Sequence, residues 1–142
     1  MVKPVYHSVV TSPYGWRVLN GERQFHDGID FVCDKHVNQS VRAITAGVVT
    51  YDFDNYQEAL RWVKSEHSIG NAVIIEHTIG GKYYFVRYCH LVKNYVTAGE
   101  SVTEGQIIGA YGDVGYSFGP HLHIDAYDDG WKKVDITKLL EA

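Results

Sequence analysis

The sequence contains few cysteines and no long apolar run. Its two cysteines, Cys33 and Cys89, are too few for a disulfide framework and do not form a Cys-x-x-Cys pair. We therefore expect both to be small buried apolar side chains. No segment approaches the roughly 20 residues of a membrane span, and the first residues include no apolar stretch of signal-peptide length. These absences predict a chain with no membrane span and no export signal.

Clusters of basic residues are also missing. The chain has 13 Lys and Arg against 17 Asp and Glu, a net charge of -4, and its basic residues are scattered. This distribution excludes the positive surface of a nucleic-acid-binding protein and argues against a membrane-surface helix. With 142 residues the chain is long enough to bury a core without disulfides, and we expect one domain covering residues 1–142, most simply a monomer.

Short apolar runs interrupted by glycine predict a fold of the mainly β class. Their lengths and β-branched content favour strands over helices, and "TIGG" at 78–81 is suited to a hairpin turn between two of them. The predicted strands lie in residues 28–33, 40–53, 71–77, 82–91, 106–113 and 121–127. We expect these strands to form an antiparallel sheet.

Two segments have the pattern of helices. In "NYQEALRWVKSEH", Asn55 and Glu58 have the spacing of a capping box, which predicts a helical insertion at about 54–67. In "DITKLLEA", Asp135 is a candidate N-cap for a short C-terminal helix.

The segment "GPHLHID" at 119–125 places two histidines two positions apart. Side chains at i and i+2 of a strand project to the same face, so His121 and His123 would point into one site. A solvated strand face with two ordinary polar residues would have the same spacing. Further candidate ligands elsewhere in the chain are therefore needed to distinguish a site from a surface.

The segment "FHDGIDF" at 25–31 supplies such ligands. In a strand, His26 and Asp30 would share a face, and Gly28 between them would leave room for both side chains. Imidazoles and one carboxylate from separate segments make a catalytic zinc set, because three protein ligands leave one tetrahedral position open. A third segment, "RYCHL", adds His90, which we expect at the end of a strand on the same face as Tyr88.

These three segments resemble, in order, the signature blocks of the lysostaphin/LytM-type zinc endopeptidases. "TSPYGWR", "VRAITAGVV", "GNAVIIEH" and "VTEGQIIGAYGDVG" are also similar to the family pattern, so the resemblance covers nearly the whole chain. It implies a compact antiparallel β-sheet domain of that type, a duplicated hybrid-like β fold, with the metal in a groove on the central sheet. Here that domain would carry the helical insertion and the short C-terminal helix.

The resemblance also implies a role for each site residue. His26, Asp30 and His123 match the zinc ligands, and His90 and His121 match the catalytic histidines beside the metal. No His-Glu-x-x-His segment supplies a glutamate base, so histidines would handle the proton. The family is a group of hydrolases that cleave peptide bonds in the stem peptides or cross-bridges of bacterial peptidoglycan, at glycine-glycine or D-alanine-linked bonds.

The sequence leaves several alternatives open. A non-catalytic member of the family would bind peptidoglycan or regulate another hydrolase, and a histidine phosphocarrier would need no metal. Two departures from the family bear on the groove, namely the insertion at about 54–67 and Phe118 in "GYSFG". We expect action on the bacterial cell wall, by a bacteriolytic endolysin of phage origin or by a fragment of a secreted protein. We expect no role in the site for the remaining histidines: His7, His36, His67 and His77.

Overall fold

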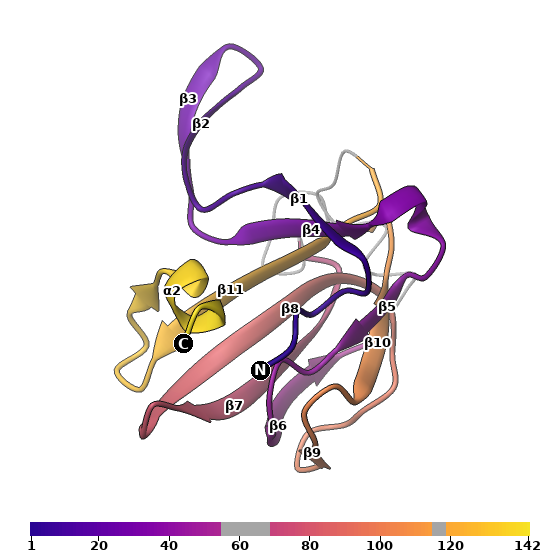
Figure 1. The fold of residues 1–142 in the computed structure, drawn as a ribbon, viewed down its shortest axis with the longest axis vertical. Helices are drawn as coiled ribbons and strands as arrows, with labels where there is room; N and C mark the ends of the chain where they lie inside the picture. The colour runs from indigo at the N-terminus through magenta and orange to yellow at the C-terminus, as the bar shows by residue number, and fades with distance from the viewer. Residues whose placement is uncertain (55–68, 115–118) are drawn as a thin grey trace.

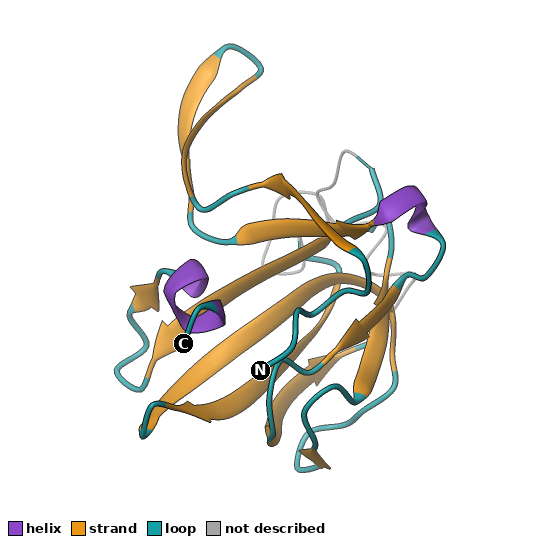
Figure 2. Ribbon diagram, viewed as in Figure 1, coloured by secondary structure: helices purple, strands orange, loops and turns teal. Residues whose placement is uncertain are grey.

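The computed structural model describes residues 1–54, 69–114 and 119–142, and strands dominate it (Figure 2). The strands are β1 (Ser8–Ser12), β2 (Gly15–Leu19), β3 (Glu22–His26), β4 (Ile29–Cys33), β5 (Ser40–Arg42), β6 (Gly47–Phe53), β7 (Asn71–Ile79), β8 (Lys82–Asn94), β9 (Ser101–Val102), β10 (Ile107–Tyr111), β11 (Leu122–Asp128) and β12 (Lys133–Val134). The helices are the 3-10 turn η1 (Asp34–His36) and α2 (Ile136–Leu140). The predicted mainly β class is confirmed.

Ten of these strands form one sheet, and all of its pairings are antiparallel. The order along the sheet is β1-β4-β11-β8-β7-β6-β9, while β10 pairs with β5 and β8, and β12 pairs with β11. β2 and β3 form a separate hairpin that extends away from the body of the domain (Figure 1). Within the described residues, no helix is both long and apolar enough to cross a membrane.

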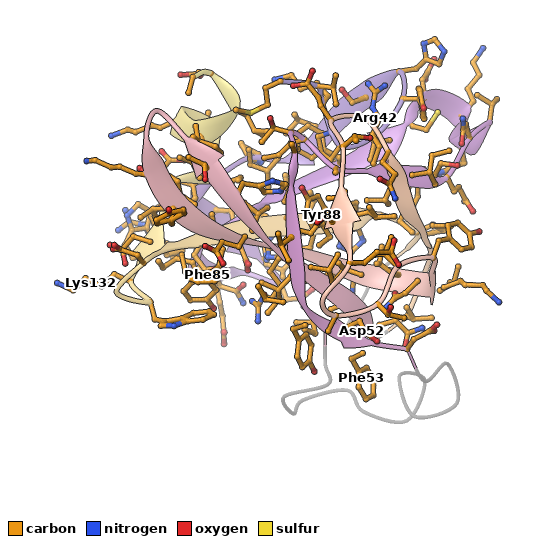
Figure 3. The ribbon with its side chains drawn as sticks, turned by 90° about the horizontal axis from the view of Figure 1, so that it is seen from below. Arg42, Asp52, Phe53, Phe85, Tyr88 and Lys132 are labelled. Atoms are coloured by element: carbon orange, nitrogen blue, oxygen red, sulfur yellow. The ribbon has the colours of Figure 1, made fainter. Side chains whose placement is uncertain are left out.

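The hydrophobic core lies on one face of the central strands. Tyr88 of β8 and Ile124 of β11 are completely buried there, and Tyr88 lies near the centre of the molecule whereas Lys132 projects from its edge (Figure 3). Cys33 and Cys89 are buried free thiols, as the sequence predicts. Because the core occupies one face, the opposite face of β8 and β11 is available for polar side chains.

Local sequence accounts for two predicted features that the structure confirms. The β7–β8 hairpin turns at Gly80 (φ 59°) and Gly81 (φ 78°), and a two-residue turn of this kind needs positive φ at both positions. At α2, Asp135 Oδ1 accepts a hydrogen bond of 2.9 Å from the Thr137 amide, the predicted N-cap. The predicted helical insertion at about 54–67 lies, apart from Asp54, outside the described part of the chain.

The prediction of one continuous strand through "FHDGIDF" is wrong. β3 ends at His26, β4 begins at Ile29, and the two strands pair with different partners. Gly28, in the break, lies so close to the ring of His123 that a Cβ there would be 2.5 Å from its Cε1. The room that this glycine provides is therefore occupied by the histidine of another strand.

The predictions for His90 also need correction. β8 continues to Asn94, and His90 does not share the buried core face of Tyr88. Val73 pairs with Tyr88 but Asn71 pairs with Leu91, so β8 contains one extra residue at this point. His90, with φ 63°, lies in this bulge. In a bulge, side chains no longer alternate strictly between the two faces of the sheet. The bulge turns His90 out of the core and into a groove.

Candidate metal centre

Three side chains from three strands meet on the polar face of the sheet. His26 ends β3, Asp30 lies in β4, and His123 lies in β11 directly opposite Asp30. Nδ1 of His123 is 2.9 Å from Oδ1 of Asp30. Nε2 of His26 is 3.3 Å from the same oxygen and 3.2 Å from His123 Nδ1. The spacing predicted from sequence thus brings one atom of each residue to a common point.

The second nitrogen of each imidazole is already engaged. Nδ1 of His26 lies 3.0 Å from the carbonyl oxygen of Pro13, which can only accept, so Nδ1 donates and Nε2 carries the lone pair. Nε2 of His123 lies 3.0 Å from Oδ2 of Asp125, so in the neutral ring Nδ1 carries the lone pair. In both rings the nitrogen that faces Asp30 is the one suited to bind a metal.

Asp125 is buried behind His123 in a network of charges. Arg87 donates to its two carboxylate oxygens at 3.0 and 2.7 Å, and Lys133 Nζ lies 2.9 Å from Oδ2. Burial alone would raise the pKa of Asp125, but its hydrogen bonds to His123 and Arg87 hold the pKa far below its usual value. Asp125 is therefore a fixed anion that orients the imidazole of His123.

Charge also controls protonation at Asp30 and His123. Burial alone would raise the pKa of Asp30, but its hydrogen bonds to His123 and His26 hold the pKa well below the usual range. Burial would lower the pKa of His123, whereas the hydrogen bonds to Asp125 and Asp30 outweigh this and raise the pKa to about 9. A proton and a metal ion therefore compete for Nδ1 of His123.

His90 and His121 lie beside this set with their rings 4.6 Å apart. Nδ1 of His90 donates to the carbonyl of Val114 at 2.7 Å, and Nδ1 of His121 donates to that of Gly119 at 2.9 Å. Burial, together with the charge of His121, lowers the pKa of His90 to about 4. The carbonyls leave Nε2 of each ring as the basic nitrogen, and Nε2 of His121 is 3.8 Å from Asp30 Oδ1.

All five predicted site residues line one groove of about 850 Å³. Three residues at the site were missed by sequence reasoning: Ser12 and Arg17 in the N-terminal strands, and Asp125. The signal for Asp125 was present, because it lies two positions after His123 on the same strand face. Ser12 and Arg17 lie in "TSPYGWR", but that segment alone did not point to the site: Ser12 is placed by the pairing of β1 with β4, opposite Asp30, and Arg17 by the β2–β3 hairpin.

The donor set fits a tetrahedral zinc ion. Bonds of about 2.0–2.1 Å place the donors of such an ion about 3.3 Å apart, close to the observed separations. A second group in the described residues, Asp27 with His123 and Asp125, is also close enough to hold an ion. Lys133, however, lies 3.5 Å from Asp27 and 2.9 Å from Asp125, and so neutralises that group. The first set is the better metal site.

Comparison with known proteins is consistent with this arrangement. The sequence model for Peptidase family M23 matches residues 24–136, a range that contains the five site residues. The chain belongs to peptidase family M23. This M23 domain is 32% identical, over 132 residues, to the DD-carboxypeptidase/endopeptidase Mpg of Neisseria meningitidis, covering 91% of the chain and 26% of the relative.

Two further proteins are similar to this chain, one in sequence and one in fold. A shorter match, 46% identical over 56 residues, covers 39% of the chain and 12% of the peptidoglycan DD-endopeptidase ShyA of Vibrio cholerae. The fold is similar to that of the catalytic domain of lysostaphin from Staphylococcus simulans, with a TM-score of 0.66 and 28% identity over 94% of this chain and 90% of that one. The predicted lysostaphin-type fold is confirmed, and the chain spans about a quarter or less of the curated relatives.

Proposed function

We propose that this M23 domain is a zinc-dependent endopeptidase that cleaves peptide bonds in the stem peptides or cross-bridges of bacterial peptidoglycan. The proposal depends chiefly on one observation. Three metal-binding atoms converge within 3.3 Å of one another, and two histidines with basic Nε2 atoms lie beside them in the same groove. Relatives named for DD-endopeptidase activity support the choice of substrate.

His26, Asp30 and His123 would hold the ion through Nε2, Oδ1 and Nδ1. When bound, Zn²⁺ supplies a Lewis acid that polarises a carbonyl and lowers the pKa of a water ligand to about 7. The single carboxylate leaves the loaded set with a net positive charge, which favours that chemistry. Asp125 would keep the His123 ring in the tautomer that presents Nδ1 to the ion.

His90 and His121 would handle the proton. With Nδ1 of each ring donating to a backbone carbonyl, Nε2 can accept the proton of the attacking water and pass it to the departing amine. Burial lowers the pKa of His90 to about 4, so its ring is neutral near pH 7 and Nε2 carries a lone pair. The site of action would be the cell wall, whether the protein is delivered by a phage, released on lysis or cut from a secreted precursor.

The proposal is tested by digesting peptidoglycans of different cross-bridge chemistry with the zinc-loaded protein and identifying the fragments by mass spectrometry. We expect hydrolysis that a chelator abolishes and added zinc restores. In the His121→Ala variant we expect turnover to fall by at least about 100-fold while zinc content stays near one ion per chain. A fully active variant would show that His121 is not needed for catalysis. Zinc binding without any hydrolysis in the wild type would instead indicate a non-catalytic, peptidoglycan-binding protein.

A further inference from the structure

Arg17 places a guanidinium group in the groove, beside the proposed metal ligands. It lies in β2, opposite Gln24 of β3, and both side chains line the groove. Among the described residues that line this groove, Arg17 is the only lysine or arginine. Nothing in the mechanism above uses this charge.

The contacts of Arg17 leave much of its hydrogen-bonding capacity for a ligand. Nη1 donates to Ser12 Oγ at 2.9 Å and lies 3.8 Å from Oδ2 of Asp30, which is beyond hydrogen-bond distance. Nε is buried and has no hydrogen-bond partner. A guanidinium carries five N–H donors in a fork that fits a carboxylate, and a buried donor without an acceptor is costly. Nη1 thus anchors the group, whereas Nε lacks an acceptor.

We propose that Arg17 binds a free carboxylate on the residue that supplies the leaving amine, and so selects the bond that is cut. The preferred substrates would be peptides in which the carbon attached to the scissile nitrogen bears a carboxylate. Such bonds include one to a C-terminal alanine and a cross-link to the amino group of a diamino acid. This inference rests on the proposed peptidase function and makes its substrate class narrower.

The distances support this assignment. A carboxylate carbon on the leaving residue is separated from the scissile nitrogen by two bonds of about 1.5 Å each. The scissile bond must lie next to Asp30 and His123, and Arg17 Nη1 is 3.8 Å from the nearer oxygen of Asp30. The guanidinium is therefore about one residue's length from a proposed metal ligand. Internal glycine-glycine bonds place a neutral amide, with no negative charge, at the same position.

Arg17 has a structural role to be distinguished from substrate binding, because it contacts Ser12 and lies near Asp30. A residue that only supports Asp30 would affect zinc binding and would affect all substrates equally. A residue that binds the substrate carboxylate would affect only substrates that have one. Arg23 of the same hairpin offers a matched control, since its guanidinium lies 4.2 Å from the Trp16 ring and it does not line the groove.

The experiment measures hydrolysis of two substrates by the zinc-loaded protein: an acetylated stem pentapeptide ending in D-Ala-D-Ala, and the same peptide with a C-terminal amide. For the wild type we expect kcat/KM to favour the acid by about 10–100-fold. Arg17→Gln should remove that preference by lowering kcat/KM for the acid alone, with zinc content unchanged. Arg17→Lys, which keeps the charge but loses the fork, should retain part of the preference for the acid. Arg23→Gln should behave as the wild type.

Three results would overturn the role of Arg17. They are an equal loss on acid and amide in Arg17→Gln, a loss of zinc in that variant, or a wild type that prefers an amidated pentaglycine peptide. Calorimetric binding of the acid and the amide to zinc-loaded His121→Ala protein separates this inference from the proposed function. Binding that prefers the acid and requires Arg17, in a wild type without hydrolysis, would reject the peptidase and retain the carboxylate site.

Discussion

Two histidines on opposite faces of the central sheet, His77 and the partly buried His123, have opposite electrostatic environments. His77 of β7 lies on the core face, where Nδ1 donates to the Ala46 carbonyl at 3.0 Å and Nε2 is 2.9 Å from the Tyr88 hydroxyl. His123 lies on the groove face between the carboxylates of Asp30 and Asp125. Burial lowers the pKa of His77, whereas the two carboxylates raise that of His123.

The difference teaches that burial alone does not identify a functional histidine. Neutral partners satisfy both nitrogens of His77, which suits a residue that links β7 to β8 and to the backbone just before β6. Charged partners around His123 raise the basicity of its ring, and Nδ1 also faces Asp30 and His26, with which it forms the proposed metal site. We therefore expect changes at the two histidines to have separable effects.

The largest effect is expected for His123→Ala. Loss of Nδ1 leaves two ligands for the metal, so zinc content and peptidoglycan hydrolysis should both fall to background. Metal content is measured by mass spectrometry of the dialysed protein, and folding is checked by circular dichroism. A folded variant that still holds nearly one zinc ion per chain would remove His123 from the ligand set.

A smaller effect is expected for Asp125→Asn. The change keeps the shape of the side chain but removes the charge that orients His123, and we expect zinc affinity to fall by about 10–100-fold. Competition with a chromophoric chelator measures this affinity. Asp27→Asn is the matched control, because Asp27 also contacts Lys133 but is half exposed. Equal losses in the two variants would favour the alternative metal group that contains Asp27.

The smallest effect is expected at His77 and depends on pH. The unfolded chain binds a proton at His77 below its ordinary pKa of 6.5, whereas the folded chain resists protonation there. Stability from this residue is therefore complete above pH 6.5 and decreases as pH falls, by up to about 1.4 kcal/mol per pH unit.

The variant His77→Gln isolates that contribution, because glutamine does not titrate. Near pH 7.5 we expect it to lower the free energy of unfolding by about 1–3 kcal/mol, with zinc binding unchanged. The gap to the wild type should narrow at pH 5.5. Denaturant unfolding in the presence of a chelator measures both values, with exposed His7→Gln as the control. A gap that is constant or wider at pH 5.5 would show that His77 is protonated in the folded protein.

The sequence was most informative where pattern and turn chemistry agree. Alternation in "HLHIDAY" placed His121 and His123 on one face, and Gly80 and Gly81 located the β7–β8 hairpin. Strands β1 to β3 were not predicted, because they are short, largely exposed and only weakly apolar in pattern. Their contribution to the site, Arg17, depends on how the hairpin is placed in space, which no local pattern encodes.

His90 shows a different limit. The sequence predicts that His90 lies at the site, but it does not predict the strand face correctly. One inserted residue in β8 shifts the alternation of side chains between the two faces. Hydropathy and composition do not reveal a bulge, because the residues on either side of it are of the same types as in a regular strand.

The extra residue in β8 also affects how the domain can evolve. Removing one residue at the bulge would restore plain alternation and turn His90 towards the core, while the strands that carry His26, Asp30 and His123 would keep their register. A length change of a single codon, with no substitution at any proposed metal ligand, is thus a short genetic route from a groove with both proposed proton-transfer histidines to one that keeps only the proposed metal-binding residues.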